Sequence, residues 1–253
     1  MLYGCSSVPV TGRKQLSFVP APQMNSLAAT TYTETLASNK LSTNVEQTAM
    51  IQRVGGRISN AVDQYIAENN MSSSVSGFQW EFNLIDDPQV NAWCMPGGKV
   101  AFYTGILPIC QNESGIAVVM GHEIAHAVAN HSGERMSQQL MVQMGGMALT
   151  TALQQKSELT QQIALTVFNV GSQVGAILPY SRLHEFEADK LGVIFMAMAG
   201  YDPNEAPMFW ERMQALSEGT APPQFLSTHP SDDKRISELK AAIPEAMKYY
   251  RAQ

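Results

Sequence analysis

The segment G-H-E-I-A-H at residues 121–126 constrains the fold of this chain more than any other part of its sequence. On an α-helix with 3.6 residues per turn, His122 and His126 lie about 40° apart on one face, so both imidazoles can reach a single metal ion. Glu123 lies beside that face and can reach a water molecule bound to the metal. The segment therefore predicts a helix that carries two metal ligands and a general base.

A third protein ligand is expected, because a catalytic zinc ion normally has three protein ligands and one position open to water. In one known pattern this ligand is a histidine six residues after the second histidine. Ser132 occupies that place, and His131 misses it by one residue. If the helix continued, His131 would point about 140° to 180° away from the two ligand histidines. We therefore interpret His131 as a histidine at the surface or at the edge of the core.

A carboxylate from a later helix is the other source of a third ligand. The segment S-R-L-H-E-F-E-A-D-K at residues 181–190 contains Glu185 and Asp189, which are four residues apart and share one helical face. This spacing suits a metal ligand and a second carboxylate that accepts the free ring N–H of a ligand histidine, with His122 as the expected recipient. The predicted site comprises His122, His126 and Glu185 as metal ligands, Asp189 as their support, and Glu123 as general base.

Two neighbours in this segment compete with Glu185 for the metal. Glu187 is two residues further on and faces about 200° away on a helix, so only one of the two glutamates can share a face with Asp189. His184 is the other competitor. A solvated helix face is the alternative interpretation of the three acids, and the upstream motif decides in favour of Glu185.

The composition favours one compact domain. The chain has 253 residues, of which 45% are hydrophobic and 15% charged, enough to bury a core without disulfides. We expect an extended N-terminal arm over residues 1–25 and a single domain over residues 26–253. The formal net charge is -6 and no cluster of basic residues could follow a phosphate backbone, so nucleic acid is not an expected partner.

Hydrophobic periodicity predicts an α+β chain in which helices dominate. Gln79–Ile85 alternates with period two, and a second strand is expected over Lys99–Thr104, so that the two form a small antiparallel sheet. The segment N-A-W-C-M-P-G-G between them is interpreted as a turn-rich connector. Helices are expected over about 26–38, 43–69, 113–130, 134–155, 158–178, 182–199, 204–217 and 231–250.

Two long uncharged stretches, residues 136–155 and 159–181, are interrupted by Gln, Asn, Ser and Gly. They predict buried or amphipathic helices and not membrane spans. Several of the fifteen methionines lie in the first stretch. We interpret these methionines as adaptable core filler, with a client-binding or lid surface as the alternative.

The chain resembles the zinc metalloendopeptidase family typified by HtpX and the CAAX prenyl protease. The resemblance lies in H-E-I-A-H, S-R-L-H-E-F-E-A-D, T-H-P-S-D-D-K-R-I and N-A-W-C-M-P-G-G-K-V, and it covers residues 4 to about 240. It implies a gluzincin fold with one zinc ion per chain, endopeptidase activity in the cell envelope, and quality control of membrane or outer-membrane proteins. The transmembrane helices of HtpX and the tetratricopeptide repeats of some members are not found here, which weakens inferences about their partners.

The opening G-C-S-S-V-P-V-T-G-R-K-Q-L-S-F-V-P is similar to the bacterial lipoprotein branch of this family, which includes BepA and LoiP-like proteins. In that branch a cysteine at the place of Cys5 carries the lipid, so membrane attachment is expected only through Cys5, on the periplasmic side of the envelope. An ordinary tail residue is the alternative. Cys94 and Cys110 are then left either as a disulfide pair or as two small buried thiols.

The strand that begins at Lys99 follows the position that family members use as an edge strand above the metal. An extended substrate could pair with the free N–H and C=O groups of such a strand. An ordinary buried strand is the alternative. The expected substrate-binding residues are Gly98, Lys99, Val100, Ala101 and Phe102.

His229, in T-H-P-S-D-D-K-R, has two interpretations. It precedes Ser231 and two aspartates that suit the start of the last helix, and this place alone explains it. Alternatively it reaches the zinc, where it stabilises the developing oxyanion or occupies the open position in a resting state. Arg182 and Arg235 are interpreted as structural ion-pair partners.

An envelope chaperone or assembly factor, whose zinc site is structural or self-inhibited, is the alternative to an endopeptidase.

Overall fold

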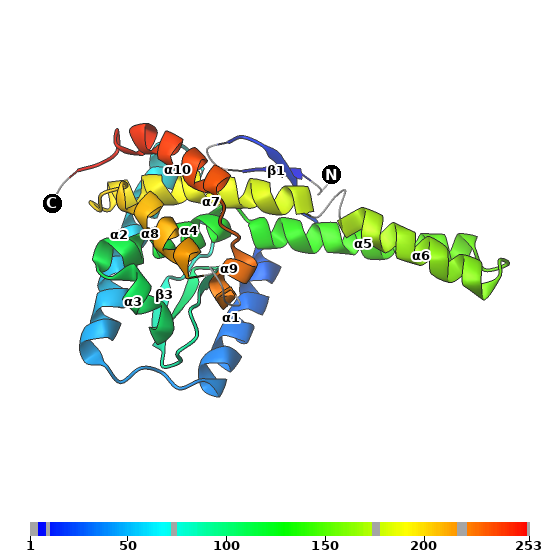
Figure 1. Cartoon of the computed structure of the whole chain (residues 1–253), viewed down its shortest axis with the longest axis horizontal. Coiled ribbons are helices and arrows are strands. Elements are labelled where there is room, and N and C mark those ends of the chain that lie inside the picture. The colour runs from blue at the N-terminus through cyan, green and yellow to red at the C-terminus, as the bar shows by residue number, and fades with distance from the viewer. Residues whose placement is uncertain (1–4, 9–10, 72–74, 174–177, 217–221, 252–253) are drawn as a thin grey trace.

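The computed structural model of the protein describes residues 5–8, 11–71, 75–173, 178–216 and 222–251. Within them, helices surround a small three-stranded sheet, and a long helical hairpin extends away from the rest (Figure 1). The predicted α+β class with dominant helices is confirmed. The helices are α1 (Ala21–Ser38), α2 (Val45–Glu68), α3 (Leu107–Cys110), α4 (Glu113–Val128), α5 (His131–Ala152), α6 (Glu158–Ser172), α7 (Leu178–Met198), α8 (Glu205–Ala215), α9 (Gln224–Thr228) and α10 (Asp233–Ala246), with a short 3-10 turn, η2 (Thr104–Ile106).

Each helix predicted from the sequence is present, although several ends differ. Helix α1 begins at Ala21 and not near residue 26, because Pro20 and Pro22 suit a helix start, where a missing N–H costs nothing. Residues 174–177, within the helix predicted over about 158–178, and the predicted end at residue 217 lie outside the described residues. The short helices α3 and α9 were not predicted, since a single turn leaves no periodicity to detect.

Helix α4 is buried along almost its whole length, because its sequence is apolar on nearly every side. Every residue from Gly115 to Val128 is buried. A helix without a solvent-facing side must lie inside a domain, and α2, α7 and α8 pack around it. Asn112 fixes its start, since the side-chain oxygen accepts the backbone N–H groups of Ser114 and Gly115. The metal-binding motif therefore lies in the interior.

Helices α4 and α7 touch backbone to backbone at two glycines. A Cβ atom added at Gly121 would lie 2.8 Å from the carbonyl oxygen of Gly192, and one added at Gly192 would lie 2.9 Å from the backbone nitrogen of His122. No side chain fits between the helices at this point. The segments that carry both halves of the predicted site are thereby held side by side.

The sheet is mixed and not antiparallel as expected. It consists of β3 (Glu81–Ile85), β4 (Ala92–Met95) and β5 (Lys99–Tyr103), in the order β3-β5-β4. Strand β5 pairs in parallel with β3 and antiparallel with β4. The reason is that the expected connector is itself a strand: Gly97 and Gly98 both have positive φ and turn β4 tightly back onto β5.

The prediction that the strand from Lys99 forms the edge is therefore wrong. Strand β5 has a hydrogen-bonded neighbour on each side, so its backbone groups are already paired. The alternative of an ordinary buried strand describes Val100, Ala101 and Phe102, which are all fully buried. The edge on the β4 side is the one next to α4.

The N-terminal arm is only partly extended. Its strands β1 (Cys5–Ser7) and β2 (Lys14–Leu16) form an antiparallel pair, and β2 contacts α5. The backbone N–H of Phe18 donates to the hydroxyl of Ser137, at 3.0 Å. The arm thus crosses the root of the helical hairpin before α1 continues along the sheet.

The hairpin of α5 and α6 extends away from the domain as a pair of packed helices (Figure 1). Met141, Met144 and Met147 are exposed, so the interpretation of these methionines as core filler is wrong. Helix α6 has no buried residue, and α5 packs against it. Among the described residues, no helix is long and apolar enough to cross a membrane.

Cys94 and Cys110 are both buried free thiols. Of the two alternatives for this pair, the structure contains two separate small buried side chains. Burial raises the pKa of Cys110, with Glu205 adding to the effect and Arg212 opposing it, so this thiol stays protonated at neutral pH.

Replacing Gly192 by Ala tests the contact between α4 and α7. The added methyl group meets backbone atoms that cannot rotate away, so G192A should lower the free energy of unfolding by about 1–3 kcal/mol. The control is G56A in α2, where an added Cβ meets nothing within 4 Å, and which should raise stability by about 0.5–1 kcal/mol. Urea unfolding measures both, and equal stability of G192A and the parent would show that the helices are not in contact.

Candidate active site and metal centre

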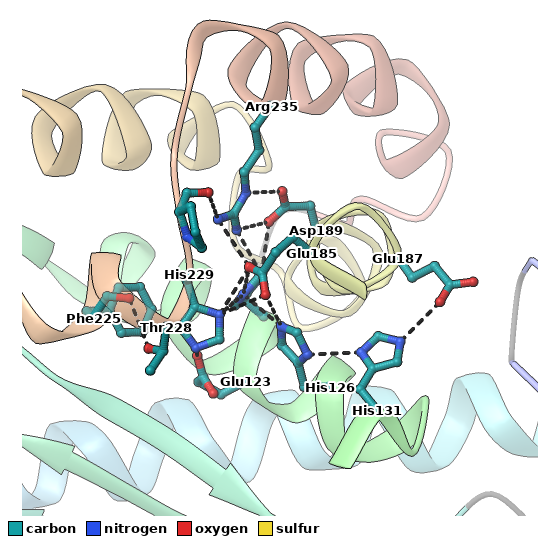
Figure 2. A network of polar contacts seen from close by, with 12 residues as sticks. Glu123, His126, His131, Glu185, Glu187, Asp189, Phe225, Thr228, His229 and Arg235 are labelled. Carbon is teal, nitrogen blue, oxygen red and sulfur yellow. Dashed lines mark hydrogen bonds and ion pairs between the residues drawn. The ribbon is translucent and has the colours of Figure 1, made fainter. Parts of the chain in front are cut away.

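Four side chains from three parts of the chain converge at one point in the interior. His122 and His126 come from α4, Glu185 from α7, and His229 from the end of α9. Figure 2 shows His126, Glu185 and His229 pointing toward one another. Their ligand atoms all lie within 4.8 Å of one another, and all four residues are buried. The structure thus brings the three predicted metal ligands together and adds His229 to them.

The ring nitrogens point at one another across this centre. The Nε2 atoms of His122 and His126 are 3.1 Å apart, and the Nε2 of His122 is also 3.1 Å from the Nδ1 of His229. Imidazole nitrogens and one carboxylate are the donor set that zinc and similar divalent metals prefer. The residues present therefore fit a divalent metal ion.

Glu185 supplies the negative charge of the centre. Its carboxylate oxygens lie 3.3 Å from the Nε2 atoms of both His122 and His126. Burial alone would raise the pKa of Glu185, but the imidazoles around it outweigh this effect and hold the pKa well below its usual range. Glu185 is therefore ionised, as a metal ligand must be.

His122 is oriented by the carboxylate that the sequence analysis assigned to it. The Nδ1 of His122 lies 2.9 Å from Asp189, and Arg235 donates two hydrogen bonds to the same carboxylate, at 2.7 and 2.8 Å. The guanidinium also lies over the ring of Trp210 and contacts Glu185. Burial would raise the pKa of Asp189, but Arg235 outweighs it and lowers the pKa. With Nδ1 facing a charged acceptor, Nε2 keeps its lone pair for the centre.

Arg235 is thus an ion-pair partner, as predicted, whereas Arg182 is exposed on α7. The contact of Arg235 with Glu185 was not foreseen. Asp232, and not Ser231, caps α10, since its side chain accepts the backbone N–H of Arg235.

His126 is oriented through a second histidine. The Nδ1 of His126 lies 2.9 Å from the Nδ1 of His131, whose Nε2 lies 3.1 Å from Glu187 (Figure 2). His131 is fully buried, so its interpretation as a surface or core-edge residue is wrong. The helix does not continue as assumed: Asn130 takes a left-handed conformation, with φ 56° and ψ 34°, and turns the chain so that His131 points back to His126.

Glu123 lies next to the centre on α4. Its Oε1 is 3.2 Å from the Nε2 of His229, and the backbone of Cys94 in β4 acts to lower its pKa. Burial raises the pKa of Glu123, although His229 and His122 oppose this effect. A buried carboxyl group with a raised pKa beside a metal centre suits a general base.

The position of His229 is compatible with both interpretations offered from the sequence. It ends α9 just before the cap of α10, and its backbone N–H donates to Phe225 at 2.8 Å. At the same time its ring lies between two acids, with Nδ1 3.0 Å from Glu185 and Nε2 facing Glu123 (Figure 2). The ring therefore occupies the side of the centre where a fourth ligand would bind.

A cluster of charged and polar side chains lies between the N-terminal arm and helices α5 and α7. Arg13 donates to both oxygens of Glu134, at 2.7 and 2.8 Å, and to both oxygens of Glu187, at 2.9 and 3.0 Å. The Nε2 of His184 lies 2.8 Å from Glu134. We call this group the arm cluster; it comprises Thr11, Arg13, His131, Glu134, His184 and Glu187.

The arm cluster accounts for the two competitors of Glu185. Glu187 faces away from the centre, and His184 pairs with Glu134. Burial alone would raise the pKa of each carboxyl group of the cluster, but hydrogen bonds from the cationic and polar neighbours outweigh it and lower the pKa of Glu134 and of Glu187 to about 2. Sequence reasoning did not find the cluster, because Arg13 is 121 and 174 residues away from its two partners.

The predicted substrate residues Gly98, Lys99, Val100, Ala101 and Phe102 lie at the start of β5 or within it, one strand away from the edge. The edge strand β4 is closer to the chemistry, because its Cys94 reaches Glu123.

Comparison with known sequences agrees with this geometry. The sequence model of peptidase family M48 matches residues 53–243. The mitochondrial metalloendopeptidase OMA1 of Schizosaccharomyces pombe is 34% identical over 243 residues, which cover 94% of this chain and 66% of that protein. OMA1 of Saccharomyces cerevisiae is 35% identical over 71% of this chain and 51% of its own length. A putative beta-barrel assembly-enhancing protease of Vibrio cholerae is 33% identical over 63% of this chain and 34% of its own length.

A buried H-E-x-x-H helix joined by a glutamate from a later helix is an arrangement typical of metallopeptidases. The chain belongs to peptidase family M48. It spans less than two thirds of the length of each of these three relatives.

Replacing Glu134 by Gln tests the arm cluster through its pH dependence. Because the pKa of Glu134 in the folded protein is about 2, its charge contributes stability above the ordinary value of 4.5, and this contribution is lost as the pH falls toward 2. E134Q should lower the free energy of unfolding by about 1–3 kcal/mol near pH 7, and its difference from the parent should narrow between pH 4.5 and pH 2. E34Q, at an exposed site on α1, should show neither effect in urea titrations. A difference that stays constant with pH would contradict the assignment.

Proposed function

We propose that this protein is a zinc-dependent endopeptidase with one zinc ion per chain, held by His122, His126 and Glu185. The observation that carries the proposal is the convergence of these three side chains with Glu123 immediately beside them. A structural zinc site would have no use for a buried carboxyl group that is not a ligand. Membership of family M48 and relatives named metalloendopeptidases support the same activity.

Zinc, when bound, supplies an activated water molecule and polarises the carbonyl of the scissile peptide bond. Glu123 takes the proton of that water on its carboxylate and delivers it to the nitrogen of the leaving amine. The raised pKa of Glu123 suits its role as the base, because a more basic carboxylate takes up a proton more readily. Asp189 and His131 keep the two ligand histidines in the tautomer that offers Nε2 to the metal.

We place the peptide-binding edge at β4 in place of β5. The backbone N–H of Cys94 points away from β5 and toward Glu123, so the outward edge of β4 faces the site. In an antiparallel pair, alternate residues point their backbone groups outward, which adds Ala92 to Cys94. An extended peptide added along this edge is held mainly by main-chain hydrogen bonds, which predicts broad sequence specificity.

Replacing Glu123 by Gln tests the proposal. E123Q should bind as much zinc as the parent, because Glu123 is not a ligand, and should lower kcat on an unfolded protein such as casein by at least a factor of about 100 to 10,000. The measurements are metal analysis of the purified proteins and cleavage of casein and of a quenched-fluorescence peptide. Cleavage by E123Q at the parent rate would remove Glu123 from the mechanism.

The position of His229 favours a second candidate, an envelope chaperone or assembly factor whose zinc site is self-inhibited or structural. With Nδ1 at 3.1 Å from His122 and 3.0 Å from Glu185, His229 can complete a four-ligand set. Structural zinc sites usually fill all four positions with protein ligands. The exposed methionines of α5 offer a surface suited to apolar clients, which favours the same candidate.

Replacing His229 by Ala separates the candidates. If His229 blocks the open position of a working enzyme, H229A should retain zinc and cleave a short peptide several times faster than the parent. If the site is structural, H229A should lose zinc and gain no activity. A fall in kcat with zinc content and KM unchanged would contradict both of these roles for His229, would support the endopeptidase, and would make His229 the group that stabilises the oxyanion.

The setting of this activity is proposed from the relatives. One relative is named for enhancing beta-barrel assembly and others are mitochondrial, so we propose polypeptide substrates among envelope or outer-membrane proteins, on the periplasmic side of a bacterial envelope. A lipid on Cys5 would attach the chain to the membrane, as the similarity to BepA and LoiP-like lipoproteins implies. Nucleic acid is not proposed as a partner, given the net charge of -6.

A further inference from the structure

We propose that the N-terminal arm positions the metal ligand His126, acting from Arg13 through Glu187 and His131. The proposal rests on the proposed metal site and adds three positioning residues to it. It assigns the arm a role in the metal centre, although the arm lies outside residues 53–243, the part matched to the family.

The first link is the contact between the two histidines. If the Nε2 of His126 offers its lone pair to a metal, the ring of this neutral histidine carries its proton on Nδ1. That proton points at the Nδ1 of His131, 2.9 Å away, which must then be the acceptor. His131 consequently carries its own proton on Nε2.

The second link anchors His131. Its Nε2 lies 3.1 Å from an oxygen of Glu187, which as a carboxylate can only accept. All proton positions along this path are thus determined by the carboxylate at its far end. A change at Glu187 would release the ring of His131, and through it the orientation and tautomer of His126.

The third link comes from the arm. Arg13 donates from Nε and a terminal nitrogen to the two oxygens of Glu187, and Thr11 donates its hydroxyl to the same carboxylate at 2.7 Å. Along another edge of the guanidinium, Nη1 and Nη2 donate to the two oxygens of Glu134. A planar guanidinium that bonds two carboxylates at once has a fixed geometry, which the ammonium group of a lysine cannot reproduce. Arg13 therefore fixes the carboxylate in both position and angle.

The two ligand histidines of α4 are supported in parallel ways. His122 is backed directly by Asp189, which a guanidinium holds with two hydrogen bonds. His126 is supported by the same combination of carboxylate and guanidinium, but His131 lies between His126 and the carboxylate. The difference is the origin of the guanidinium, since Arg235 follows the site in sequence whereas Arg13 belongs to the arm.

The test is metal affinity, measured on the full chain by competition with a chromogenic chelator for zinc. R13K keeps the positive charge but loses the paired hydrogen bonds to the two carboxylates. It should weaken zinc binding at least about tenfold, within the 10- to 100-fold range typical of groups that orient ligands. The matched control is R53K, since Arg53 also donates two hydrogen bonds to a glutamate, Glu113, but at the surface and away from the metal. R53K should bind zinc like the parent.

A second comparison separates positioning from general stabilisation. H131F removes both ring nitrogens while keeping a ring that can stack on His184, and should weaken zinc binding as much as R13K or more. If the arm acts through His131, adding R13K to H131F should weaken binding no further. The variant T11V, which removes one hydrogen bond to Glu187, should give a smaller loss of zinc affinity. It tests the same path if H131F does not fold.

The visible absorption of the cobalt-loaded protein gives a readout of ligand geometry that overall stability does not affect. The spectrum should change in R13K and H131F and should match that of the parent in R53K. Equal zinc affinity of R13K and R53K would overturn the proposal, and so would a full further loss when R13K is added to H131F. A parent that binds no zinc or cleaves no peptide would instead contradict the proposed function.

Discussion

The contact of α4 with α7 at Gly121 and Gly192 sets the geometry of the whole site. The helices approach until any side chain at either position would collide with the backbone of the other. A predicted ligand and the carboxylate that supports it flank the contact: His122 follows Gly121 directly, and Asp189 precedes Gly192 by less than one turn. The distance between the imidazole of His122 and the carboxylate of Asp189 therefore depends on two glycines, which have no side chain to separate the helices.

Close packing of these helices creates an electrostatic problem that the rest of the fold resolves. Buried carboxylates and imidazoles are costly unless each has a partner. Asp189 is paired with Arg235, which α10 brings to one side of the centre. Glu187 is paired with Arg13, which the arm brings to the other side. Segments at opposite ends of the chain thus stabilise one buried set of charges.

The sequence predicted what depends on spacing within one helix. The places of His122 and His126 on one face, and of Glu185 and Asp189 on another, follow from 3.6 residues per turn. The structure brings His122, His126 and Glu185 to one point, with Asp189 against the Nδ1 of His122. His131 shows the limit of this reasoning, because its direction was extrapolated along a straight helix. A single left-handed residue at Asn130 reverses that direction.

Longer-range features of the fold could not be read from local patterns. Strand β4 is only four residues long and carries Trp, Cys and Met, so its period-two pattern was too short to separate it from a turn. Missing it led to the wrong sheet order. The contacts of Arg13 depend on a hairpin at the start of the chain meeting helices far along it, and no spacing encodes such a meeting.

The segment that joins α9 to α10 has two opposed tasks, and this restricts how the site can open. His229 contacts Glu185 within the centre, whereas Arg235, a few residues later, must stay in place to hold Asp189. Arg235 also donates to the carbonyl of Pro230, at 2.9 Å, which ties the start of the segment to α10. If His229 is to leave the centre while the support of His122 is kept, the movement has to come from the α9 side of Pro230. The ring of His229 can then withdraw together with α9, and α10 with its arginine remains where the metal ligands need it.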